Sequence, residues 1–171
     1  DKMIGERSGE EVRYVLYIKG IFKQGITIVN DPDTPNKYIA ADLRLARPTR
    51  TRMKKDKNRF KIEVNISLEG GLIGSQANRN YLEQKSLSTT EQQLEVTIRK
   101  GCMDIIKRAQ AEFSSDIFAF GNKARHLSLT WDMWDDMEWL KKFKDADIDV
   151  SVKVDLRRTG LLFESPHPSA N

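Results

Sequence analysis

The sequence has little of what metal sites, disulfides and nucleophilic catalysis require. It contains one cysteine and two histidines among its 171 residues. The single cysteine, Cys102, excludes an intramolecular disulfide and a metal cluster built from several cysteines. His126 and His167 lie far apart, and His167 is in a Pro/Ser-rich tail. We therefore expect neither a histidine-based zinc site nor a Ser-His-Asp relay.

Long apolar runs are also missing. The runs that are present, such as residues 38–41, are far shorter than the roughly 20 residues of a membrane-spanning helix. This excludes a transmembrane chain. The sequence begins with neither an initiator methionine nor a signal peptide, so we expect a fragment or the mature form of a longer protein.

What the sequence does contain is typical of a polar globular domain. Apolar residues make up 39% and charged residues 32%, and 29 basic against 25 acidic residues give a net charge of +4. This length favours one domain. We expect a single domain over residues 1–163 and a disordered tail over residues 164–171, which are rich in Pro and Ser.

The segment 1–19 fits two structures. The capping-box spacing of Ser8 and Glu11 predicts a helix start, and the apolar residues that follow fit a helical period. The same apolar residues also alternate as in a strand. We favour a short helix.

Four later segments are predicted to be strands: 21–30, 38–47, 60–68 and 147–163. The clearest is 60–68, where apolar and polar residues alternate strictly. We expect Gly70 and Gly71 to end it. The run 70–74 lacks the Lys-Ser/Thr of a phosphate-binding loop and is interpreted as a turn.

Two amphipathic helices are predicted to cover the sheet. A second capping box at Ser88 and Glu91 precedes an apolar stripe that continues to Phe113, despite Gly101. A shorter tryptophan-containing helix is expected over 130–143, with aspartates near its start and lysines at its end. The order of elements predicts a two-layer α+β fold, with a largely antiparallel sheet covered on one face.

The dominant charge feature is a basic stretch between residues 44 and 61, interrupted by one acid, Asp56. It contains no Trp or Tyr on which nucleic-acid bases could stack. It fits a solvated hairpin edge, a contact with an anionic membrane or a protein, or sequence-blind nucleic-acid binding. The candidate contact residues are Arg44, Arg47, Arg50, Arg52, Lys54, Lys55, Lys57 and Arg59.

Other candidate chemistry is weaker. Asp132, Asp135 and Asp136 are close enough on one helix to hold a hard cation, but they lack the spacing and glycine of an EF-hand. We interpret them as charges at a helix start. Cys102 falls on the apolar helix face, where an inert buried thiol is expected, and His126 is its only candidate base. The residues predict no catalytic, cofactor-binding or metal site.

Three passages resemble one family when taken in order. They are residues 1–5 with 8–11, residues 115–121, and the final strand from Val150 with residues 158–161. Together they are similar to the C subunit of bacterial spore germinant receptors, the Ger(x)C family. Ala119 stands where the family usually has glycine. The motif positions, which we interpret structurally, are Gly5, Asp116, Phe118, Phe120, Gly121, Arg158 and Gly160.

The resemblance implies a non-enzymatic subunit of a nutrient germinant receptor. It implies protein–protein contacts with integral-membrane A and B subunits at the outer face of the inner spore membrane. The full-length protein would be lipid-anchored there, and this chain would be a soluble part of it. The resemblance implies no cofactor. The alternative interpretation is a basic nucleic-acid- or polyanion-binding module.

Overall fold

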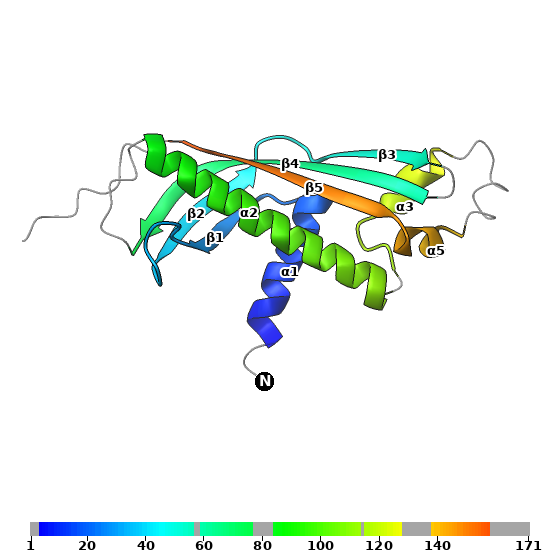
Figure 1. Cartoon of the computed structure of the whole chain (residues 1–171), viewed down its shortest axis with the longest axis horizontal. Helices are drawn as coiled ribbons and strands as arrows, with labels where there is room; N and C mark the ends of the chain where they lie inside the picture. The colour runs from blue at the N-terminus through cyan, green and yellow to red at the C-terminus, as the bar shows by residue number, and fades with distance from the viewer. Residues whose placement is uncertain (1–3, 57–58, 77–83, 114, 128–137, 158–171) are drawn as a thin grey trace, which may run out of the picture.

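In a computed structural model of the protein, residues 4–56, 59–76, 84–113, 115–127 and 138–157 are described. A five-stranded sheet forms one layer, and a long helix, α2 (Gln84–Arg108), lies along it (Figure 1). The predicted α+β class is confirmed. α2 continues into a π-helical turn, η1 (Ala109–Phe113).

The sheet is organised around one long strand, β4 (Arg59–Ser75). Along one edge of β4 lie β2 (Tyr38–Leu45) and then β3 (Arg50–Asp56), both antiparallel to it. β1 (Gln24–Asn30) pairs with β2 as an outer strand. Along the other edge of β4 lies β5 (Asp147–Leu156), which is parallel to it.

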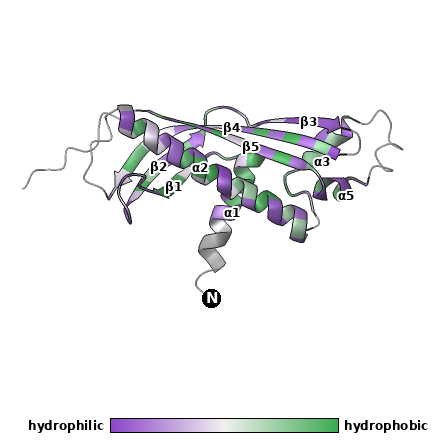
Figure 2. Cartoon of the chain, in the orientation of Figure 1, coloured by the Kyte–Doolittle hydropathy of each residue, from purple (hydrophilic) through white to green (hydrophobic). Residues whose placement is uncertain are grey.

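Polar and apolar residues alternate along β4 and β5 (Figure 2). The burial of every second side chain gives the sheet one apolar face. Residues such as Ile62, Val64 and Val150 are buried there, with α2 residues such as Leu94 and Ile98 among the same core. Their neighbours Lys61 and Asp149 point to the opposite, exposed face. The alternation therefore predicted correctly which side chains enter the core.

The helix favoured for the N-terminal segment is confirmed as α1 (Ile4–Lys19). It begins before Ser8, so the capping-box interpretation of that residue was wrong. The last turn of α1 is joined to the sheet: Tyr17 is fully buried, and its carbonyl accepts a hydrogen bond of 2.7 Å from the Thr49 hydroxyl. The Tyr17 ring packs against Phe22 at 4.4 Å between centroids.

The second capping box is also inside its helix. α2 begins at Gln84, and the Thr89 and Thr90 hydroxyls donate to the carbonyls of Lys85 and Ser86, each at 2.9 Å. Ser88, the predicted cap, therefore lies inside the helix. The hydroxyls next to it bond backward along the helix, as Ser and Thr do in helix interiors. The predicted long apolar stripe is present, but its helix begins earlier than expected.

Gly101 explains how α1 approaches α2. A Cβ at this position would lie 2.2 Å from the Tyr14 ring of α1. The glycine costs about 1 kcal/mol of helix propensity relative to alanine. It allows the Tyr14 ring to lie directly on the α2 backbone.

The predicted turn at residues 70–74 is wrong, because β4 continues through it to Ser75. At Gly70 an added Cβ would lie 1.9 Å from the Asp42 carbonyl oxygen of β2. The glycine is therefore needed for close approach of two strands. A register shift against Ala40 and Ala41 follows, and it leaves Ile73 as the extra residue of a β-bulge.

The region between α2 and β5 has two short helices, α3 (Phe120–Arg125) and α5 (Trp139–Lys144). α3 was not predicted. α5 corresponds to the end of the helix expected over 130–143, and the rest of that expectation lies outside the described residues. So do the end of the strand predicted to residue 163 and the tail over residues 164–171.

Gly70→Ala is expected to lower the free energy of unfolding by about 2 kcal/mol or more, because the new methyl group collides with backbone atoms of β2. Gly74→Ala in the same strand is the matched control, since nothing lies within 4 Å of a Cβ there. Its expected change is below about 0.5 kcal/mol. Urea denaturation of both variants measures the difference, and equal stabilities would contradict the close-approach explanation.

Candidate interaction surface and motif residues

The basic stretch is divided by the fold into two parts. Arg50, Arg52 and Lys54 alternate along β3 and are exposed on the face away from the helices. Thr51 and Met53 lie between them on the other face and are half-buried, and Met53 packs against the core. The hairpin edge that we considered for this stretch is present.

Arg44 and Arg47 precede this strand and are bound to β4. Arg44 Nη2 lies 2.8 Å from Glu69 Oε1, and Arg157 Nη2 lies 2.7 Å from Glu69 Oε2. The hydrogen bond from Arg44 lowers the pKa of Glu69, with a further contribution from Arg157. Arg47 Nε donates to Ser67 Oγ at 2.9 Å. Both arginines therefore have partners within the domain.

Unlike Arg44 and Arg47, the cations of β3 are not paired within the described residues. Within the part of the chain that the structure describes, Arg50, Arg52 and Lys54 have no ion-pair partner. The remaining candidates, Lys55 and Arg59, are exposed at the end of the hairpin. Lys57 lies outside the described residues. Among the described candidate contact residues of the basic stretch, the cations without an ion-pair partner therefore lie on β3 and at the end of its hairpin.

On the other edge of β4, the outer strand β5 is contacted by α2, which runs alongside it (Figure 1). Glu91 Oε1 accepts a hydrogen bond of 2.8 Å from the Leu156 amide, and Glu95 Oε1 accepts one of 3.0 Å from the Val154 amide. Arg99 Nε donates to the Val150 carbonyl at 2.8 Å. These side chains bond backbone groups that a strand edge would otherwise expose.

This contact was not predicted from the sequence. Its signal was available: Glu91, Glu95 and Arg99 recur at four-residue steps and form one polar stripe beside the apolar stripe of the helix. Glu95 also lies 3.0 Å from Lys153 Nζ and raises the pKa of that lysine. Arg99 Nη2 lies 2.9 Å from Asp149 Oδ1, so the aspartate has a partner.

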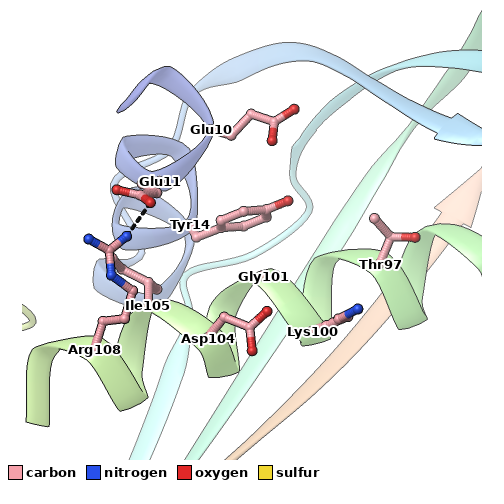
Figure 3. Close-up of a pocket in the computed structure, with 9 residues that line it drawn as sticks. All are labelled: Glu10, Glu11, Tyr14, Thr97, Lys100, Gly101, Asp104, Ile105 and Arg108. Atoms are coloured by element: carbon pink, nitrogen blue, oxygen red, sulfur yellow. Dashed lines mark hydrogen bonds and ion pairs between the residues drawn. The ribbon is translucent and has the colours of Figure 1, made fainter. Parts of the chain in front are cut away.

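A groove of about 290 Å³ is lined by residues of α1 and α2 (Figure 3). Tyr14 and Gly101 lie at its centre, and acidic and basic side chains are mixed around it. Glu11 and Arg108 form an ion pair across the helices. Burial, with Glu10 nearby, raises the pKa of Tyr14. The mixed charges indicate a helix–helix junction and favour no single class of ligand.

The structure tests part of what the sequence indicated about the aspartate cluster and the thiol. Among the described residues, no group of His, Cys, Asp and Glu is arranged to hold a metal ion. Asp132, Asp135 and Asp136 lie outside them. Cys102 is buried as predicted, and burial raises the pKa of its thiol to about 12. The thiol is therefore protonated at neutral pH and is not a nucleophile. His126 is exposed at the end of α3.

Asp116 joins two segments that are distant in sequence. Its Oδ2 accepts a hydrogen bond of 2.5 Å from the Gly121 amide and one of 3.0 Å from Trp139 Nε1. A Cβ on Gly121 would lie 2.8 Å from that indole nitrogen. Trp139, which the sequence analysis did not single out, in turn packs edge-on against Phe60 of β4 at 5.3 Å.

The two phenylalanines of the same passage are buried. Phe118 and Phe120 lie 5.4 Å apart, and both pack near Phe143 of α5 at 6.5 and 6.3 Å. This is the position expected of residues that seal helices against the sheet, although their importance for stability stays a prediction. Of the other motif residues, Gly5 lies in the first turns of α1, while Arg158 and Gly160 lie outside the described residues.

Ala119 has a left-handed backbone, with φ 62° and ψ 31°. This conformation costs an alanine about 1–2 kcal/mol, whereas glycine adopts it without steric penalty. The conformation explains why glycine is suited to this position. The turn therefore keeps its conformation although alanine replaces the family's usual glycine, and the backbone of Ala119 is strained.

These features define a class: an α+β domain with a buried, unreactive thiol, one side-chain-closed sheet edge and one basic edge strand. Residues 1–160 match the family model described as spore germination B3/GerAC like, C-terminal, and the chain belongs to this family. The family and its fold are those of a germinant receptor subunit and not of a known enzyme class.

Two individual proteins illustrate the relationship. The chain is 25% identical over 162 residues to spore germination protein YndF of Bacillus subtilis (strain 168), covering 93% of this chain and 39% of that protein. The crystal structure of the GerBC protein matches the fold with a TM-score of 0.71 at 13% identity, over 87% of this chain and 45% of that one. The chain thus spans less than half the length of both.

Ala119→Gly is expected to raise the free energy of unfolding by about 0.5–1 kcal/mol, because relief of the left-handed strain exceeds the added entropy of the unfolded chain. Ala111→Gly, at an exposed helical position, is the control and is expected to lower it by up to about 1 kcal/mol. Thermal and urea unfolding of the two variants compare the signs. A loss of stability in Ala119→Gly would contradict the strain.

Proposed function

We propose that this chain is a non-enzymatic domain of a germinant receptor C subunit, and that it acts in spore germination through protein–protein contacts at the spore membrane. The observation that carries the proposal is the row of exposed cations on β3, which lack partners within the described part of the domain. A charged surface that is not used within the fold favours contact with an oppositely charged partner.

The partners that the family suggests are the integral-membrane A and B subunits of the receptor. The domain would meet them at the outer face of the inner spore membrane, with lipid anchoring supplied by the full-length protein. Among the described residues, no helix is long and apolar enough to cross a membrane. An anionic membrane surface is an alternative contact for the same cations.

Binding of nucleic acid or another polyanion is the competing function. Exposed cations support it, but β3 presents no aromatic side chain for base stacking, and its half-buried residues are Thr51 and Met53. Such binding would depend on charge alone and would fall steeply with salt. A protein contact would additionally depend on the shape of the strand.

Charge reversal of β3 tests the proposal. Spores in which the full-length protein carries Arg50→Glu, Arg52→Glu and Lys54→Glu are expected to germinate with nutrient about tenfold more slowly or worse, since three surface contacts become repulsive. Arg47 is left unchanged because it donates to Ser67. Germination is followed by loss of optical density, with receptor levels measured by immunoblot.

The matched control reverses three exposed lysines on other segments, Lys23, Lys37 and Lys123, with the same change in charge. It should germinate normally. Normal germination of the β3 variant at unchanged protein level would overturn the assignment of this surface. Equal defects in both variants would point to net charge, as expected of a polyanion binder.

A further inference from the structure

We propose that β3 binds an extended acidic segment of a partner protein as an added strand of the sheet. The inference rests on the proposed function, because it specifies how the basic surface would contact that partner. It depends on three properties of β3: an open edge, backbone groups directed outward, and cations at every second position.

Among the described residues, no strand covers the outer edge of β3, whereas side chains of α2 bond part of the outer edge of β5. Glu91, Glu95 and Arg99 bond the backbone of β5, as described above. On the far side of β3 no strand among the described residues pairs with it, and all of its side chains are exposed or half-buried. An edge strand with free backbone groups is a template for strand addition.

The register identifies which backbone groups point outward. The Ser67 carbonyl accepts a hydrogen bond from Ala46 on the β2 and β3 side, and the Gly70 carbonyl accepts one from Arg157 on the β5 side. The backbone N–H and C=O groups of odd-numbered β4 residues therefore point toward β3. Their partners are Arg50, Arg52 and Lys54, so the N–H and C=O groups of Thr51, Met53 and Lys55 point to the free edge.

The side chains of β3 specify the chemistry of the partner. An added strand would place every second side chain beside Arg50, Arg52 and Lys54 on the exposed face. The side chains between them would lie beside Thr51 and Met53 at the margin of the core. The fitting sequence alternates acidic and apolar residues over the seven residues of β3.

β1 is another outer strand among the described residues, and it fits this partner poorly. Its exposed face has Ile26 and Ile28, which are 50% and 61% exposed, and no basic side chain lies on the strand itself. An acidic segment would gain no charge pairing there. Complementary charge therefore selects β3.

The test uses the whole chain and a synthetic peptide, fluorescein-Thr-Glu-Val-Glu-Val-Glu-Thr-amide, with binding measured by fluorescence anisotropy at physiological salt. The control peptide has the same composition with the three glutamates adjacent. Two more peptides are N-methylated, either on the valines or on the glutamates. In an added antiparallel strand the valine amides donate to β3, and in an added parallel strand the glutamate amides do. Only one of the two methylated peptides therefore loses its hydrogen bonds to β3.

We expect the parent peptide to bind about tenfold or more tightly than the control, and only one of the methylated peptides to lose binding. Equal binding by the parent, the control and both methylated peptides would overturn strand addition and indicate attraction of charge alone. Absence of binding by the parent peptide would also overturn it.

Two variants locate the site. Thr51→Pro removes an outward N–H that the ladder to β4 does not use, and it should abolish peptide binding while Thr51→Ala retains it. Reversal of Arg50, Arg52 and Lys54 to Glu should transfer binding to a peptide with Lys in place of Glu. If the reversal impairs germination but Thr51→Pro binds the peptide like the parent chain, strand addition fails and the proposed function stands.

Discussion

Two carboxylates and one guanidinium of α2 hydrogen-bond the outer backbone of β5, and the arrangement of both layers depends on this contact. It fixes the long helix along the parallel strand. The apolar side chains of Leu94 and Ile98 then lie over the sheet. A parallel strand at the edge of a sheet would otherwise expose a row of amides and carbonyls to unwanted pairing. Because this contact comes from a helix on one side only, β3 on the other side of β4 is a basic strand whose outer edge pairs with no strand among the described residues.

Sequence periodicity was sufficient for most of the fold. Strict alternation in residues 60–68 and 147–156 predicted the buried faces of β4 and β5, and the three- and four-residue steps from Leu94 onward predicted α2. These signals succeed because one face of each element is buried. The basic stretch was likewise visible, and the ordered passages led to the family. The sequence could not predict which cations of the basic stretch are bound within the domain. The partners of Arg44 and Arg47 come from β4, which follows later in the chain.

The errors share a physical origin: local signals were outweighed by long-range packing. Both capping boxes lie inside helices, and the glycines at 70 and 71 continue a strand because β2 approaches too closely for a side chain at Gly70. The Asp116 contact joins α3 to Trp139 across a long separation in the chain, which no local pattern encodes. The left-handed conformation of Ala119 shows the same effect, since packing around it sustains a backbone that alanine disfavours.

The outer edges of β5 and β3 differ in whether their amides are hydrogen-bonded. Amide hydrogen exchange on the intact chain measures this difference most directly. Val154 and Leu156 should be protected, since their amides donate to Glu95 and Glu91. Along β3 the rates should alternate, with Arg52 and Lys54 slow and Thr51, Met53 and Lys55 close to the rates of an unstructured peptide. Uniform protection along β3, or exchange at Val154 and Leu156 as fast as at Met53, would contradict one closed and one open edge.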